Sequence, residues 1–208
     1  MFDSILFDLD GTLWNAVPEV AISWTLGLEQ LGIHRPPLTV QEIFPCMGLP
    51  LSDIVDRLVP GHRPEEKPRI IAHCCQVEND YLARHGAALY PGEEEVLGAL
   101  KKKYALFVVS NCAVGYIETY FQSTGMGKFF TGFESAGNTG LTKAENIALV
   151  ARRHGLKRPV YVGDTALDHS SAREAGVPFI HAAYGFGQVE GVPAIQSLGE
   201  LEGLLETL

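Results

Sequence analysis

Two aspartates lie two residues apart directly after the first apolar run of the 208-residue chain, in the segment SILFDLDGT. Residues two apart on an extended strand point the same way, so Asp8 and Asp10 can face one ligand. Such a pair can divide the roles of nucleophile and proton donor between its members. Taken alone, an Asp-x-Asp pair before a glycine is equally compatible with a turn.

Three later segments place chemically active side chains at similar positions. The run ALFVVS ends at Ser110, the pair Thr142-Lys143 opens a helical segment, and PVYVG is followed by Asp164 and, one helical turn on, Asp168. Each could be structural by itself, as a helix cap, a turn or a solvated charge. If the apolar runs are parallel strands of one sheet, however, these residues meet at the edge where ligands bind in such folds.

A convergence of Asp8, Asp10, Asp164 and Asp168 would be repulsive without a cation. Because the set contains neither histidine nor thiolate, it favours Mg²⁺ over zinc. Four carboxylates, one Mg²⁺ and the Lys143 ammonium leave a single negative charge, which one bound proton removes. That proton also supplies a general acid, so the pattern predicts a Mg²⁺ site that accepts a phosphate dianion.

The segments that must position these residues show two different patterns of hydrophobic residues. Residues 4–8 form a strand-like run, and residues 15–88 show helical periodicity interrupted by prolines, with Trp14 and Trp24 expected to pack in this helical part. After Pro91-Gly92, helices alternate with strands at 105–110, 131–134, 159–163 and 178–181. We therefore predict a doubly wound parallel α/β core of residues 1–14 and 89–208, with a small all-helical cap of residues 15–88 inserted after the first strand.

Composition excludes several classes of protein. A hydrophobic share of 46% is too high for a disordered chain, and no stretch of about 18 apolar residues is available to span a membrane. The acidic start lacks the features of a signal peptide, and the four cysteines show no CxxC spacing, so we expect a cytoplasmic protein with reduced thiols. The net charge of −9 argues against nucleic acid or an anionic membrane as a partner. Nothing demands a partner chain, so a monomer or weak dimer is expected.

The segments FDLDGT, VVSN, LTKAEN and VGDTALD, in this order, resemble the four motifs of the haloacid dehalogenase-like hydrolase superfamily. The helical insert resembles the C1-type cap of its phosphatase branch, which includes phosphoglycolate phosphatase-like and β-phosphoglucomutase-like proteins. The resemblance covers nearly the whole chain. It implies a Rossmann-like core, a Mg²⁺ cofactor and hydrolysis of a small phosphorylated metabolite.

The resemblance also implies a role for each motif residue. Asp8 would be the nucleophile that forms an aspartyl-phosphate, and Asp10 would be the general acid and then the general base. Asp8, Asp164 and the Asp10 carbonyl would bind Mg²⁺, with Asp168 binding it directly or through water. The phosphoryl group would be held by Ser110 and Lys143. Further substrate contacts are expected from Thr12, Asn111 and the cap turn at Met47 and Gly48.

Departures from the family pattern bear on the alternatives. Lys143 is followed by Ala144 rather than the frequent proline, and the cap turn carries Met47 and Leu51 where mutases carry cations for a second phosphate. The intact Asp-x-Asp pair argues against a dehalogenase, and a nucleophile after the first strand argues against a phospho-accepting receiver. The hypothesis is a Mg²⁺-dependent phosphatase. A phosphomutase and a non-catalytic regulatory module remain as alternatives, and the metabolite is not defined by the sequence.

Overall fold

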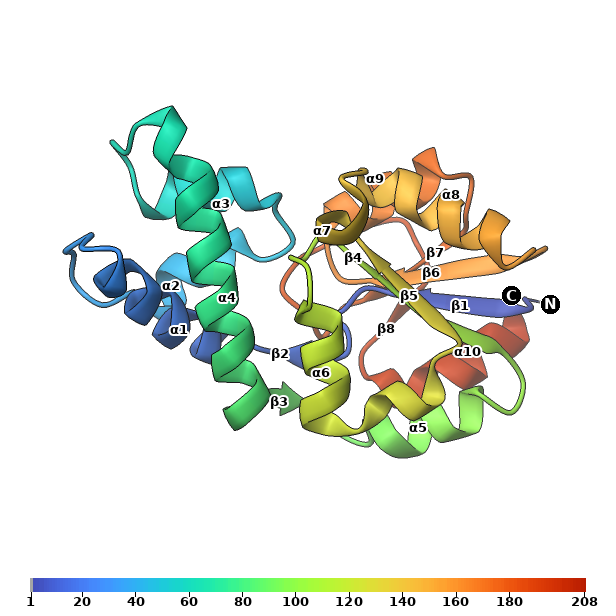
Figure 1. Ribbon diagram of the computed structural model, residues 1–208. Coiled ribbons are helices and arrows are strands. Elements are labelled where there is room, and N and C mark those ends of the chain that lie inside the picture. The colour runs from blue at the N-terminus through green and yellow to red at the C-terminus, as the bar shows by residue number, and fades with distance from the viewer. Residues whose placement is uncertain (1) are drawn as a thin grey trace.

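The computed structural model describes residues 2–208 and contains a six-stranded sheet in the order β5-β4-β1-β6-β7-β8. All five strand pairings are parallel, and β1 lies in the middle of the sheet (Figure 1). The sheet is made of β1 (Ser4–Phe7), β4 (Ala105–Ser110), β5 (Gly132–Ser135), β6 (Pro159–Gly163), β7 (Phe179–Ala182) and β8 (Ala194–Ile195).

Alternation along the strands builds one apolar layer on each face of this sheet. In β1, Ile5 and Phe7 belong to the larger core cluster, whereas Leu6 belongs to a second cluster on the opposite face. Helices α8 and α9 pack over the second face, and α5, α6 and α10 contribute to the larger cluster. The bounds are α5 (Glu93–Leu100), α6 (Tyr116–Thr124), α7 (Ala136–Thr139), α8 (Lys143–Arg153), α9 (Ala166–Glu174) and α10 (Leu201–Thr207). The predicted doubly wound parallel fold is therefore confirmed.

Four helices lie between two very short strands that follow the first core strand. β2 (Trp14–Asn15) pairs antiparallel with β3 (Ala88–Leu89), and the predicted domain boundaries fall within this ribbon. Figure 1 shows the four helices grouped at the carboxyl end of β1, to one side of the sheet. They are α1 (Val17–Gln30), α2 (Val40–Ile43), α3 (Leu51–Leu58) and α4 (Lys67–His85). This group, residues 17–85, is called the cap below.

Short elements account for the differences from the predicted pattern. The ribbon of β2 and β3, the edge strand β8 and helix α7 were not predicted, because two to four residues carry no recognisable periodicity. Short 3₁₀ turns at Phe44–Cys46, Pro64–Glu66, Met126–Phe129 and Leu198–Glu200 complete the described chain. Within residues 2–208, no helix combines the length and apolarity needed to cross a membrane.

Candidate active site

The register of the three central strands brings the predicted site residues to one edge of the sheet. Phe7, the last residue of β1, is level with Val108 of β4 and Val162 of β6. Ser110 at the end of β4, and Asp8 and Asp164 directly after β1 and β6, therefore lie at the same edge of the sheet, and all three are buried. Lys143 and Asp168 join them from the first turns of α8 and α9.

A buried lysine links two of the carboxylates. Lys143 Nζ donates hydrogen bonds to Asp8 Oδ1 at 2.9 Å and to Asp168 Oδ1 at 2.5 Å. Lys143 is the first residue of α8, whose start is set by a reciprocal capping box between Thr142 and Glu145. Burial opposes the charge of Lys143, but the Asp168 and Asp8 carboxylates outweigh it and hold its pKa well above the ordinary value. The site therefore keeps a cation beside Asp8.

Asp168 is fully engaged by neighbouring donors. Its Oδ2 accepts hydrogen bonds from the Thr165 amide at 2.9 Å and the Thr165 hydroxyl at 2.6 Å, which forms the capping box of α9. Its Oδ1 accepts from Lys143. This arrangement braces Lys143 and supports contact between Asp168 and a metal through water.

Asp164, unlike Asp168, has a carboxylate oxygen without a hydrogen-bond donor among residues 2–208. Its Oδ2 accepts a hydrogen bond from the Phe186 amide at 2.7 Å, whereas its Oδ1 is buried and has no hydrogen-bond partner in the described chain. Burial, together with the Asp168 and Asp8 charges, raises the pKa of Asp164 to about 8. Carboxylate oxygens of these three aspartates lie within 4.8 Å of one another. An unpaired buried oxygen in an all-carboxylate set fits a hard divalent cation such as Mg²⁺.

Two backbone positions that pack against the Asp164 side chain can be occupied only by glycine. Gly11 has a φ of +83°, and a Cβ there would collide with the Asp164 carboxylate. A Cβ on Gly185 would collide with the Asp164 side chain and with the Gly11 carbonyl. These two glycines let the chain close tightly around the candidate metal ligand.

Asp10 is held by two donors that sequence reasoning did not assign to the site. Trp14 Nε1 and the Tyr116 hydroxyl both donate to Asp10 Oδ1, at 3.0 and 2.9 Å, and the rings of these two residues meet edge to face at 5.5 Å. Burial, with the Asp8 charge, raises the pKa of Asp10 to about 7. A carboxyl with this pKa can carry a proton near neutral pH, as a general acid requires. In the sequence, only the position of Trp14 in the turn after Asp10 gives a weak indication of this contact. No sequence feature indicates that Tyr116 contacts Asp10.

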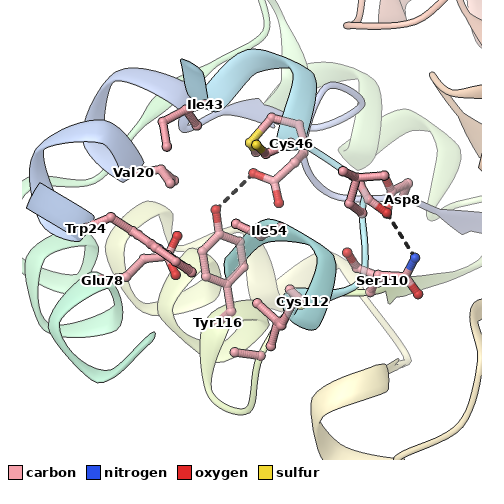
Figure 2. Close-up of a pocket in the computed structure, with 17 residues that line it drawn as sticks. Asp8, Val20, Trp24, Ile43, Cys46, Ile54, Glu78, Ser110, Cys112 and Tyr116 are labelled. Atoms are coloured by element: carbon pink, nitrogen blue, oxygen red, sulfur yellow. Dashed lines mark hydrogen bonds between the residues drawn. The ribbon is translucent and has the colours of Figure 1, made fainter. Parts of the chain in front are cut away.

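A cavity of about 60 Å³ lies over Asp8 and Asp10, between the core and the cap. Figure 2 shows Asp8 and Ser110 on one side of it and Trp24 and Glu78 on the other. The cap contributes mainly apolar groups, and none of the 17 lining residues is a lysine, arginine or histidine. The lining is Asp8, Asp10, Val20, Trp24, Ile43, Cys46, Met47, Gly48, Leu49, Leu51, Ile54, Glu78, Ser110, Asn111, Cys112, Ala113 and Tyr116.

The predicted substrate-binding residues are only partly gathered in this cavity. Asn111 Nδ2 donates to the Gly48 carbonyl at 3.1 Å, so the cap turn is closed onto the core, and Met47 also lines the cavity. Lys143 lies beyond Asp8 and lines an adjoining crevice instead. Thr12 is fully buried outside the cavity lining, with its carbonyl accepting a hydrogen bond from Tyr184.

Comparison with known proteins agrees with this arrangement. The family model of haloacid dehalogenase-like hydrolases matches residues 5–182. The chain belongs to this family. Among curated relatives, the phosphoglycolate phosphatase of Chromobacterium violaceum is 26% identical, covering 98% of this chain and 96% of the relative. That of Caulobacter vibrioides is 28% identical, covering 88% and 80%.

Solved structures of the family show the same fold. A haloacid dehalogenase-like family hydrolase from Streptococcus pneumoniae superimposes with a TM-score of 0.79 at 22% identity, and 98% of each chain is covered. The family model and the curated relatives confirm the predicted membership of the superfamily, in its phosphoglycolate phosphatase-like branch, and the predicted hydrolase class. The roles assigned to individual residues stay predictions.

Proposed function

We propose that this member of the haloacid dehalogenase-like hydrolases is a Mg²⁺-dependent phosphatase that hydrolyses a small phosphate monoester through an aspartyl-phosphate. One observation carries the proposal. Asp8 is fixed by the Lys143 ammonium, while Asp10, two residues on, is fixed through one oxygen only and faces the same cavity. The names of the curated relatives support the same reaction class.

In the first half of the reaction, the Asp8 carboxylate attacks phosphorus and the bond from phosphorus to the leaving oxygen breaks. Asp10 gives its proton to that oxygen, so the product leaves as an alcohol. The Lys143 ammonium and the Ser110 hydroxyl orient the phosphoryl oxygens. Mg²⁺ held by Asp8, Asp164 and the Asp10 carbonyl would supply neutralisation of the phosphoryl charge.

In the second half, Asp10 takes a proton from a water molecule as that water attacks phosphorus. The bond from phosphorus to the Asp8 oxygen breaks, inorganic phosphate leaves, and both aspartates return to their starting protonation states. Asp168 holds Lys143 in position throughout by its hydrogen bond to Nζ.

The cap supports hydrolysis of a small substrate over mutase chemistry. The hydrogen bond from Asn111 to Gly48 closes the turn over Asp8 and limits the space for the leaving group. A mutase must bind a second phosphate, and the cavity lining contains no basic side chain to pair with it. We therefore expect small monophosphates to be hydrolysed and phosphopeptides to be rejected.

Phosphate release from p-nitrophenyl phosphate, with millimolar Mg²⁺ or with EDTA, tests the proposal. The wild-type chain should be active only with Mg²⁺, and Asp8→Asn should lose on the order of 10³-fold or more in kcat, because an amide does not attack phosphorus. Asp53→Asn, an exposed aspartate of α3, is the matched control and should keep full activity. Activity of Asp8→Asn within tenfold of wild type would refute the nucleophile assignment, and an inactive wild type would favour the non-catalytic alternative.

A further inference from the structure

The cap side of the cavity contains two polar groups for which the proposed reaction has no use. Trp24 of α1 is 1% exposed, and its indole Nε1 has no hydrogen-bond partner within residues 2–208. Glu78 of α4 is 6% exposed. Figure 2 shows both side chains together in the cavity wall, next to Tyr116 and across from Asp8.

Both groups are costly to bury unless something else satisfies them. A buried N–H without an acceptor and a buried carboxyl without a cation each oppose folding. No basic residue lines the cavity. Burial raises the pKa of Glu78 to about 8; the neighbouring Trp24 indole N–H offsets part of that rise, and the Asp10 charge adds to it. Their placement is explained if they meet a ligand there, since they face the space that the leaving group must occupy.

We propose that Glu78 and Trp24 form a specificity pair that binds an uncharged, hydroxyl-bearing leaving group and rejects leaving groups with a carboxylate or a second phosphate. This inference rests on the proposed phosphatase function and names the substrate class for the same site. A hydroxyl can accept a hydrogen bond from Trp24 Nε1 and exchange another with the Glu78 carboxyl. It satisfies both buried groups at once.

Charged leaving groups fit the same wall less well. A carboxylate would find no cation among the lining residues, and it would repel the Asp8 carboxylate and whatever fraction of Asp10 and Glu78 is ionised. An ammonium has donors only, so it would leave the Trp24 N–H without an acceptor. Pairing it with Glu78 would require that buried carboxyl to give up its proton. The proposed substrate class therefore differs from that of the relatives named phosphoglycolate phosphatase, because the substrate in their name carries a carboxylate.

A matched series of two-carbon monophosphates tests the inference. With Mg²⁺ at pH 7, kcat/KM is measured for 2-hydroxyethyl phosphate, phosphoglycolate and phosphoethanolamine, with p-nitrophenyl phosphate as the activity reference. The neutral hydroxyl compound should exceed each charged one by at least about tenfold. Equal or higher values for phosphoglycolate or phosphoethanolamine would overturn the inference while leaving the phosphatase proposal intact. Loss of activity on all four compounds would overturn the phosphatase proposal itself.

Substitutions of Glu78 and Trp24 test whether these two residues cause the substrate preference. Glu78→Gln removes the ionisable group and offers an amide N–H₂ that can donate to a carboxylate, so the ratio of kcat/KM for 2-hydroxyethyl phosphate to that for phosphoglycolate should fall by about tenfold. Trp24→Phe removes the donor and should raise KM for the hydroxyl compound. Glu29→Gln, an exposed glutamate of α1, is the matched control and should keep the wild-type ratio. If Glu78→Gln folds and its kcat/KM ratio is unchanged, Glu78 does not determine the substrate preference. If this variant does not fold, the inference is judged from KM of Trp24→Phe for the hydroxyl compound and from the wild-type kcat/KM values for the four compounds.

Discussion

The Tyr116 hydroxyl donates a hydrogen bond to Asp10 Oδ1 at 2.9 Å and thereby ties helix α6 to the turn after β1. Trp14 Nε1 donates to the same oxygen. A carboxylic acid carries its proton on one oxygen, so two donors on Oδ1 leave Oδ2 as the site of the proton. Asp10 is thus oriented before any substrate binds, which is what a general acid needs.

Removal of one of these donors should impair proton donation selectively. Tyr116→Phe should lower kcat by about tenfold on an alkyl phosphate, because the Asp10 carboxyl gains rotational freedom. The loss should be much smaller on p-nitrophenyl phosphate, whose leaving group needs little protonation. Steady-state kinetics with both substrates measures the difference. Tyr104→Phe, which changes a buried tyrosine at the amino-terminal edge of β4, should alter neither value, and an equal loss on both substrates would show that Tyr116 acts only on packing.

Lys143 should be as important for stability as for activity. Lys143→Ala leaves Asp8 and Asp168 buried without their shared cation, so the free energy of unfolding should fall by about 3 kcal/mol or more. Urea denaturation without added metal measures this loss. Lys102→Ala changes an exposed lysine and should stay within about 0.5 kcal/mol of wild type. A similarly small change in Lys143→Ala would mean that the ion pairs contribute little to the folded state.

Mg²⁺ should stabilise the folded protein through Asp164. At a hundredfold excess over its dissociation constant, a ligand that binds only the native state adds about 2.7 kcal/mol. For a chain of this length that corresponds to a rise in Tm of roughly 5–10 °C. Thermal melts with millimolar Mg²⁺ and with EDTA should show this shift in wild type and lose it in Asp164→Asn. The same shift in both proteins would remove Asp164 from the metal site.

The convergence of Asp8, Ser110 and Asp164 was predictable because it depends on few assumptions. Each follows a short, continuously apolar run, and such runs become buried parallel strands when helices separate them. Parallel strands place their carboxyl ends at one edge, so the side chains that follow them meet. The motif order then identified the family without knowledge of the strand order.

Contacts across the junction of core and cap were not predictable in the same way. Trp14 was expected to pack in the cap, but its ring lies edge to face against Tyr116 and Tyr120 of the core helix α6. Its indole also donates to Asp10, because the chain turns sharply at Gly11. Tyr116 reaches Asp10 only through the placement of α6, which no local pattern reveals. Glu78 did leave a signal. It lies on the same helical stripe as the buried residues Cys74 and Leu82, and an acid on an apolar stripe marks either a partner or a function.

Glu93 offers a test of pH-dependent stability away from the candidate metal ligands. Its side chain is 2% exposed at the start of α5, where Oε1 accepts a hydrogen bond from Tyr120 and Oε2 has no partner in the described residues. Burial raises its pKa from 4.5 to about 7. The folded state therefore binds the proton more tightly than the unfolded chain, so this contribution to stability is complete below pH 4.5 and is lost as the pH rises through 7.

Glu93→Gln cannot titrate and should escape that loss. Between pH 5 and pH 8, wild type should lose up to about 3 kcal/mol of unfolding free energy relative to this variant. Urea denaturation at the two pH values measures the difference, and Glu95→Gln, an exposed neighbour on the same helix, should follow wild type. The unfolding free energies of Glu93→Gln and wild type could instead change in parallel between the two pH values. The pKa of Glu93 would then be the same in the folded and unfolded chain, and burial beside Tyr120 would not affect its ionisation.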